Sequence, residues 1–179
     1  MHILAISGSL RSGSTNTLLL RTAAELAPET VTITLYDGLD AIPAFSPERD
    51  QENKTESVKN LRQLLQEADA VLFCTPEYIH GMPGTLKNML DWLASSGELV
   101  DKPVGVISAG PSDMGGSRAH SSLSYTLAVL TAQLPEKASL IVPFVKTKLN
   151  AVGRVTDPVL IQQVKDVVDA LVQAVEHKE

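Results

Sequence analysis

Residues 2–16 read His2-Ile3-Leu4-Ala5-Ile6-Ser7-Gly8-Ser9-Leu10-Arg11-Ser12-Gly13-Ser14-Thr15-Asn16, an apolar strand that runs into a loop of glycine and hydroxyl residues. A helical pattern of leucine and alanine follows, so the helix N-terminus and Arg11 both bring positive charge to this loop. Gly8 and Gly13 let the backbone approach an anion. An ordinary turn with a Thr or Asn N-cap is the plain alternative, but such a cap needs no arginine. The phosphate loop, residues 7–16, therefore predicts a phosphate cradle with hydroxyl donors from Ser9, Ser14 and Thr15.

Two other phosphate-binding loops are excluded by residue type. Gly8 and Gly13 have the spacing of the Walker A loop, but Ser14 stands where that loop needs the lysine that reaches the β- and γ-phosphates. No Gly-x-Gly-x-x-Gly motif follows the strand, so the dinucleotide-binding fingerprint is also missing. The remaining interpretation is a site for one terminal phosphate, which suits a mononucleotide.

The composition limits the function classes. With 179 residues the chain is long enough for one well-buried core and short for two, so we expect residues 1–179 to form a single domain. A net charge of −6 without a cluster of Lys or Arg argues against nucleic acid or an anionic membrane as partner. We see neither a leader peptide nor an apolar stretch of membrane-spanning length. The single Cys74 suits a reducing compartment, so we expect a cytoplasmic protein.

Helical patterns alternate with short runs of Val, Ile and Leu, which is typical of βαβ units around a parallel sheet. Strands are expected at 2–7, 31–36, 70–75, 103–108 and about 138–142. The first helix is expected from the phosphate loop to about residue 27, and three more over 58–68, 86–93 and about 117–133. A last helix is expected to begin at Asp157-Pro158, an N-cap residue followed by proline. Residues 37–53 are expected to be a long irregular loop. The expected fold is α/β, a doubly wound five-stranded parallel sheet of order 2-1-3-4-5 with helices on both faces.

Two further loops follow strands at the same edge of this expected sheet. The second loop is Pro76-Glu77-Tyr78-Ile79-His80-Gly81-Met82-Pro83-Gly84, and the third loop is Ala109-Gly110-Pro111-Ser112-Asp113-Met114-Gly115-Gly116. In a sheet of order 2-1-3-4-5, strands one and three flank the switch point at which ligands bind. We therefore expect the phosphate, second and third loops to surround one ligand.

These loops resemble the NADPH-dependent FMN reductase family, whose members include soluble quinone, chromate and azo-dye reductases. The matching blocks are Gly8-Ser9-Leu10-Arg11-x-x-Ser14-x-Asn16, Pro76-Glu77-Tyr78, and Gly81-x-Pro83-Gly84-x-Leu86-Lys87-Asn88-x-Leu90-Asp91-Trp92, followed by Gly115-Gly116 and Arg118. Their order and spacing are similar to those of the family over about residues 1–130. The sequence departs at Ile79-His80, where many members have asparagine and a small or aromatic residue.

The resemblance implies a flavodoxin-like fold and a bound FMN, with NADPH or NADH as co-substrate and quinones or other small oxidants as acceptors. The 5′-phosphate would be held by Ser9, Arg11, Ser14, Thr15 and Asn16. The isoalloxazine would be wrapped by Pro76, Glu77, Tyr78, Ile79 and His80. Its pyrimidine end would lie along Ser108, Ala109 and Gly110. Because the cofactor carries the chemistry, we name no catalytic residue. The family also implies a homodimer or a dimer of dimers, in which the helix face bearing Trp92 and the start of the next helix meet the partner.

Aromatic usage distinguishes a reductase from an electron carrier. A carrier flavodoxin typically sandwiches its flavin between aromatic rings, whereas this chain has seven aromatic residues and only Tyr78 in the three loops. One face of the ring is then open to a hydride donor, which favours an enzyme. A non-enzymatic FMN-binding or electron-transfer protein of the same fold is the alternative.

Other chemistries are less well supported by the sequence. Cys74 and His80 have the spacing of a phosphatase loop, but that loop ends in arginine. Ser112 with His120 fails the nucleophile-elbow pattern of a serine hydrolase. The four histidines have no metal-ligand spacing, so no metal site is predicted.

Overall fold

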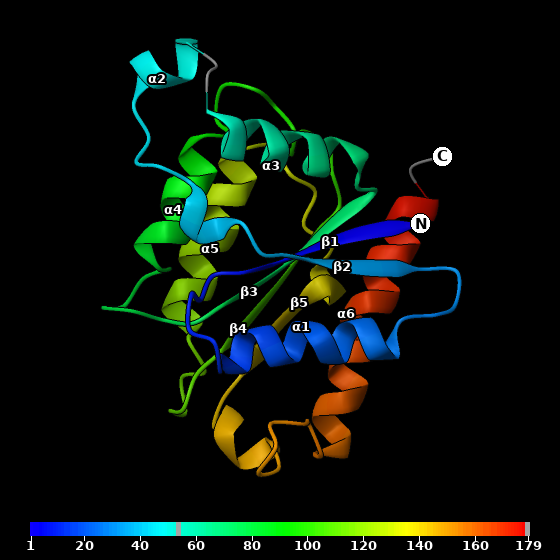
Figure 1. The fold of residues 1–179 in the computed structure, drawn as a ribbon. Coiled ribbons are helices and arrows are strands. Elements are labelled where there is room, and N and C mark those ends of the chain that lie inside the picture. The colour runs from blue at the N-terminus through cyan, green and yellow to red at the C-terminus, as the bar shows by residue number, and fades with distance from the viewer. Residues whose placement is uncertain (53–54, 178–179) are drawn as a thin grey trace.

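Five parallel strands form one sheet of order β2-β1-β3-β4-β5 in the computed structural model, which describes residues 1–52 and 55–177 (Figure 1). The strands are β1 (His2–Ser7), β2 (Thr32–Tyr36), β3 (Ala70–Thr75), β4 (Val104–Ala109) and β5 (Ser139–Val142). The α-helices are α1 (Thr15–Leu26), α2 (Pro47–Glu52), α3 (Glu56–Glu67), α4 (Gly84–Asp91), α5 (Ser117–Val129) and α6 (Pro158–Glu176). Three short 3₁₀ helices are η1 (Leu39–Ala41), η2 (Glu136–Ala138) and η3 (Val145–Lys148). The predicted fold class and strand order are confirmed.

The sheet separates two apolar cores because successive side chains of a strand point to opposite faces. Ile3 and Ala5 of β1 pack in a core with α1 and α6, whereas Leu4 and Ile6 pack in a second core with α3, α4 and α5. Figure 1 shows the same division, with α1 and α6 on one side of the sheet and the other three helices opposite. The central strand β3 is buried over its whole length, as its unbroken apolar sequence predicts.

The register of the strands brings their carboxyl ends to one edge. Ser7 of β1 pairs with Cys74 of β3, Thr75 of β3 pairs with Ser108 of β4, and Ala109 pairs with Val142 of β5. The chain segments that leave β1, β3, β4 and β5 therefore start at the same level. This edge is where a doubly wound sheet binds its ligand.

Element boundaries differ from the prediction where tertiary contacts decide them. Val31, Pro103 and Ala138 lie just outside their strands, and Ala109 belongs to β4. The helix predicted to reach residue 133 ends at Val129, and Thr131 has a left-handed φ of 59°. The Gln133 amide donates to the Lys102 carbonyl, and the Gln133 carbonyl accepts from the Val104 amide. Pairing beside the sheet thus replaces the last turn of the predicted helix.

The prediction of an irregular segment at 37–53 was wrong for two stretches, since η1 and α2 lie within it; residue 53 is outside the described residues. The Ser46 hydroxyl accepts a hydrogen bond from the Arg49 amide at 3.3 Å, and Pro47 is the first helical residue. Ser46-Pro47 is therefore a helix-start signal that was readable from the sequence.

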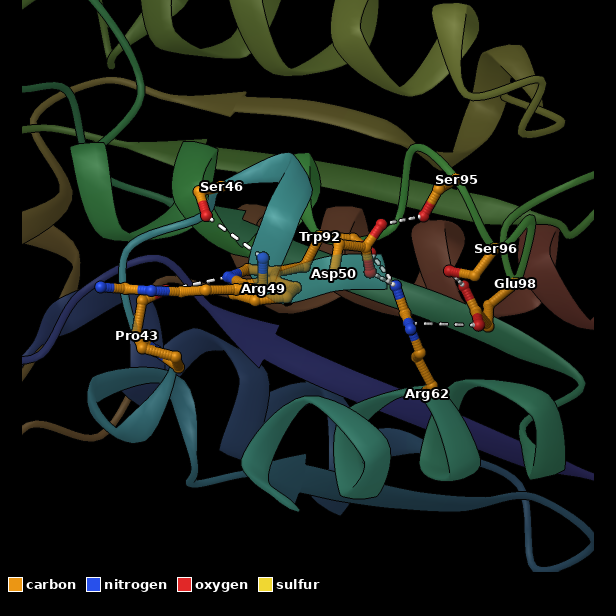
Figure 2. Close-up of polar contacts among 9 residues, drawn as sticks. All are labelled: Pro43, Ser46, Arg49, Asp50, Arg62, Trp92, Ser95, Ser96 and Glu98. Carbon is orange, nitrogen blue, oxygen red and sulfur yellow. Dashed lines mark hydrogen bonds and ion pairs between the residues drawn. The ribbon is translucent and has the colours of Figure 1, made fainter. Parts of the chain in front are cut away.

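Residues 43–50, here called the strap, are fastened to α4 and the residue after it. Asn88 accepts from the Phe45 amide at 2.8 Å and donates to the Pro43 carbonyl at 2.9 Å. The Trp92 indole N–H also donates to the Pro43 carbonyl, at 2.8 Å (Figure 2), and the Phe45 ring meets the indole edge-on at 5.3 Å. Only 1% of Trp92 is exposed. The Asn88 and Trp92 positions of the family motif therefore hold the strap in place.

A cluster of charged side chains joins the strap to α3 (Figure 2). The Arg62 guanidinium donates to Asp50 at 2.7 Å and to the Trp92 carbonyl at 2.6 Å, and its Nε lies 3.7 Å from the Glu98 carboxylate. The side chains of Arg62, Asp50 and Glu98 are 15%, 12% and 2% exposed. None of these three side chains lines the cavity at the carboxyl edge of the sheet, and we assign the cluster a structural role.

Candidate functional site

A cavity of about 450 Å³ opens at the carboxyl edge of the sheet, among the segments that follow β1, β3, β4 and β5. This volume lies in the range of roughly 300–1,000 Å³ that small-molecule sites occupy. Ten of the thirteen predicted site residues line it: Ser9, Arg11, Ser14, Thr15, Asn16, Pro76, Glu77, Tyr78, Ala109 and Gly110. The wall also contains Gly13, Pro111, Ser112, Gly116, Val145 and Lys146. A larger hollow of about 570 Å³ lies between α6 and the amino end of β5, away from the ligand-binding edge.

The phosphate loop forms one wall and ends at the N-terminus of α1. Ser14 is the N-cap, since its hydroxyl accepts from the Asn16 amide at 3.2 Å and its own amide donates to the Arg11 carbonyl at 3.1 Å. The cap leaves other amide groups of the first turn without partners in the helix, and these groups attract anions. The ordinary N-cap turn and the phosphate cradle, which the sequence offered as alternatives, are therefore compatible in this loop.

The two glycines of the phosphate loop have different surroundings. A Cβ at Gly8 would lie 3.0 Å from Leu86 Cδ2 and 3.1 Å from Thr75 Oγ1, so Gly8 allows the loop to pack against β3 and α4. Gly13 has nothing within 4 Å of an added Cβ and lines the cavity. Of the two, Gly13 is therefore the glycine that leaves backbone open to a ligand.

Asn16 is held by a residue of the neighbouring strand. Its side-chain oxygen accepts a hydrogen bond from the Cys74 thiol at 3.3 Å, and Asn16 is only 3% exposed. Burial raises the pKa of the Cys74 thiol, so the group stays neutral and acts as a donor. This contact uses the amide oxygen of Asn16 and leaves its NH₂ group as the available donor.

The second loop is a tight hairpin. The amides and carbonyls of Tyr78 and Gly81 exchange hydrogen bonds of 3.0 and 3.1 Å, and the two residues between them have φ values of 49° (Ile79) and 60° (His80). Positive φ at both central positions is the geometry of a type I′ turn. Ile79 is 99% exposed, and a β-branched residue at positive φ is strained. Ile79 and His80 stand at the tip of the hairpin and do not line the cavity.

Glu77 ties the second loop to α5. One carboxylate oxygen accepts from the amides of Arg118 (3.0 Å) and Ala119 (3.2 Å), and the other lies 3.3 Å from His80 Nδ1. Burial alone would raise the pKa of Glu77, but the bonds from Ala119, His80 and Arg118 outweigh it and the pKa falls below its usual value. The negative charge of Glu77 is therefore balanced by the N-terminus of α5.

The third loop is supported by the buried side chain of Ser108, at the end of β4. Ser108 is fully buried, does not line the cavity, and donates its hydroxyl to the Gly115 carbonyl at 3.0 Å. Gly115 has a φ of 56°, and a Cβ there would lie 2.8 Å from the Pro143 amide nitrogen. Ser108 thus supports the loop that turns over the cavity, whereas Ala109 and Gly110 reach the wall.

The segment after β5 forms a fourth wall that the motif analysis missed. The Val145 amide donates to the Gly110 carbonyl and the Phe144 amide to the Ser112 carbonyl, both at 3.0 Å. This brings Val145 and Lys146 to the cavity. No motif marks these residues, but the strand order alone places the end of β5 at the same edge, which was an available signal.

Among the residues that the structure describes, the charged side chains of the cavity wall are two cations and the Glu77 carboxylate, which the N-terminus of α5 balances. Arg11 and Lys146 both line the cavity, and in the described part of the chain neither forms an ion pair. Two free cations, hydroxyl groups and a helix N-terminus together suit a phosphate group. Among the described residues Tyr78 is the one aromatic side chain in the wall, which leaves room for a planar ring. The residues present therefore fit a flavin mononucleotide.

A doubly wound sheet of order 2-1-3-4-5 with a ligand-sized cavity at its carboxyl edge defines a flavodoxin-like fold. The family model of NADPH-dependent FMN reductase matches residues 1–147, and the chain belongs to that family. It is an oxidoreductase with FMN as cofactor and NAD(P)H as co-substrate.

The relatives support the same assignment. The chain is 34% identical to an NAD(P)H-dependent FMN reductase of Pseudomonas aeruginosa, over 88% of this chain and 85% of the relative. It is 30% identical to the quinone reductase of Escherichia coli, over 88% and 86%. Among solved structures, the flavoenzyme FerB, an NAD(P)H:acceptor oxidoreductase from Paracoccus denitrificans, superposes with a TM-score of 0.88 at 27% identity and covers 98% of this chain and 97% of its own.

Proposed function

We propose that the cavity holds FMN and that the enzyme passes reducing equivalents from NAD(P)H to quinones or similar small oxidants. When bound, FMN supplies the hydride chemistry between the nicotinamide and the acceptor. The observation that carries the proposal is the joining of the phosphate loop, the second loop and the third loop around one cavity that also holds Arg11 and Lys146. Similarity to a quinone reductase supports the choice of acceptor class.

The residues have separate tasks in this proposal. Arg11, with hydroxyl groups of Ser9 and Thr15 and the amides at the start of α1, binds the phosphate dianion, while Ser14 caps the helix. The backbone of Pro76–Tyr78 and of Ala109–Gly110 borders the ring. Ile79 and His80 lie at the rim rather than in the wall, and Ser108 acts through the third loop.

The kinetic order tests whether both substrates use one approach. In this proposal the nicotinamide and the acceptor stack on the same open face of the ring, and two planar molecules cannot occupy that face at once. We expect ping-pong kinetics: parallel double-reciprocal plots, with each substrate competing against the other at high concentration. Intersecting lines would reveal a ternary complex and a second approach. An FMN-loaded protein that does not oxidise NAD(P)H would instead be an electron carrier.

We also propose that the chain forms a homodimer, or a dimer of dimers, through α5. Tyr125 (75% exposed) and Val129 (64% exposed) form an apolar stripe one turn apart on this helix. The expected interface combined the helix face bearing Trp92 with the start of α5; the Trp92 side chain itself is buried within the subunit, so it offers no surface to a partner.

Sedimentation at micromolar concentration measures this assembly. Wild-type protein is expected at twice the subunit mass or a multiple of it, and Tyr125→Glu is expected to shift it toward the monomer because a buried charge is costly. Val152→Glu, at an 81% exposed position on another surface, is the matched control and should leave the mass unchanged. A wild-type monomer contradicts the proposal.

We also propose that residues 1–179 form a single domain and that the enzyme is cytoplasmic.

A further inference from the structure

Lys146 is a cavity residue that no motif marks. It is exposed, lines the cavity, and has no ion-pair partner among the described residues. We propose that Lys146 is a second cationic contact for the phosphate group of the bound mononucleotide, approaching it from η3 while Arg11 approaches from the phosphate loop. This inference rests on the proposed FMN site and adds a residue to it.

The backbone around Lys146 is held in a defined place. Its neighbour Val145 is 1% exposed and bonded to Gly110, and Phe144 is bonded to Ser112. Phe144 adopts a φ of 50°, and its carbonyl accepts from both the amide and the hydroxyl of Thr147, at 2.9 and 2.8 Å. A non-glycine residue at positive φ persists only where its surroundings fix it. The segment therefore presents Lys146 to the cavity from a fixed base.

The position of η3 indicates which end of the ligand Lys146 meets. Figure 1 shows the segment after β5 beside the start of α1, and the cavity wall contains both Lys146 and residues 13–16. Further along the same segment, Gly153 packs against Leu18 so closely that an added Cβ would lie 2.8 Å from its Cδ1. The Leu18 amide donates to the Ser14 carbonyl in the first turn of α1. Lys146 thus stands near the helix N-terminus that attracts the phosphate.

A second lysine on the same segment provides a matched control. Lys148 Nζ lies 3.6 Å from the Asp157 carboxylate, and Asp157 caps α6 by accepting from the Leu160 amide at 2.8 Å. Lys148 does not line the cavity. The two lysines therefore have the same charge and belong to the same 3₁₀ helix, but only Lys146 faces the ligand site.

The experiment titrates apo-protein with FMN and with riboflavin, which lacks the phosphate, and follows flavin fluorescence. Lys146→Met is expected to weaken FMN binding about tenfold, as the loss of one charge-assisted contact predicts, and to leave riboflavin binding unchanged. Lys146→Arg should retain FMN affinity, and Lys148→Met should behave as wild type. The tenfold difference should shrink in about 1 M salt, which screens exposed charges.

Each other result overturns a specific statement. Equal loss of FMN and riboflavin affinity would mean that Lys146 contacts the ring or the ribityl chain, and the phosphate proposal would be wrong. Wild-type affinity for FMN in Lys146→Met would also refute it, while leaving the FMN site intact. A wild-type protein that binds no FMN would instead refute the proposed function.

Discussion

Arg11→Ala is expected to lower FMN affinity about ten- to a hundred-fold without a measurable change in stability. A charge-assisted hydrogen bond contributes roughly 1.5–3 kcal/mol, which corresponds to this range. Arg11 is exposed, lines the cavity and forms no ion pair with any described residue, so its removal leaves no buried group unsatisfied. Titration of apo-protein with FMN and urea unfolding of the same variant measure the two quantities.

Arg21→Ala is the matched control for this prediction. Arg21 is an exposed arginine of α1 that does not line the cavity, so its loss changes the net charge equally. FMN affinity should stay within about twofold of wild type, because exposed charges at a distance are screened. If Arg11→Ala bound FMN as tightly as this control, the phosphate would be held elsewhere and the phosphate loop would be only a helix cap.

Arg62→Ala should destabilise the fold by about 3–5 kcal/mol, the usual effect of removing one member of a buried ion pair. Without Arg62, the Glu98 carboxylate (2% exposed) and the Asp50 carboxylate lose their cation, and the Trp92 carbonyl loses a donor. The hydrogen bond from Ser95, opposed by burial and assisted by Arg62, holds the pKa of Asp50 below its usual value, so Asp50 stays charged at neutral pH. Urea denaturation measures the free energy of unfolding.

The control for this prediction lies on the same helix. Lys59 pairs with Glu56, but the two side chains are 43% and 84% exposed, so Lys59→Ala should change stability by less than about 1 kcal/mol. Titration of apo-protein carrying Arg62→Ala with FMN should give wild-type affinity, because the cluster does not line the cavity. If Arg62→Ala lowered the free energy of unfolding as little as Lys59→Ala does, water would already solvate the cluster.

Local sequence patterns predicted the parts of the fold that they alone decide. The unbroken apolar run 70–75 is β3, and Asp157-Pro158 begins α6 with the Asp157 side chain bonded to the Leu160 amide. Residues 7–16 were predicted to bind a phosphate because glycine, hydroxyl and arginine residues have few other reasons to gather between a strand and a helix. Ten predicted residues meet in one cavity because the strand order brings their loops to one edge.

The remaining features depend on contacts between distant residues. The helix face bearing Trp92 was expected at a subunit surface, but the Pro43 carbonyl and the Phe45 ring, more than forty positions away, cover the indole. Glu77 lines the cavity as predicted, but the bonds from its carboxylate to the Arg118 and Ala119 amides could not be predicted. Lys146 reaches the site only because the segment after β5 bonds to the third loop. A single sequence carries no local pattern for such pairings.

The Glu77 carboxylate joins the second loop to the beginning of α5 through two hydrogen bonds. Through these bonds, we expect a ligand that orders the hairpin of Tyr78 and Gly81 to order the first turn of α5 as well, and the reverse. By thermodynamic linkage, a contact on α5 that strengthens ligand binding is itself strengthened by the ligand, and by the same factor. In a homodimer joined through α5, loss of the cofactor and separation of the subunits would then be coupled equilibria, so dilution of the enzyme would favour release of its flavin.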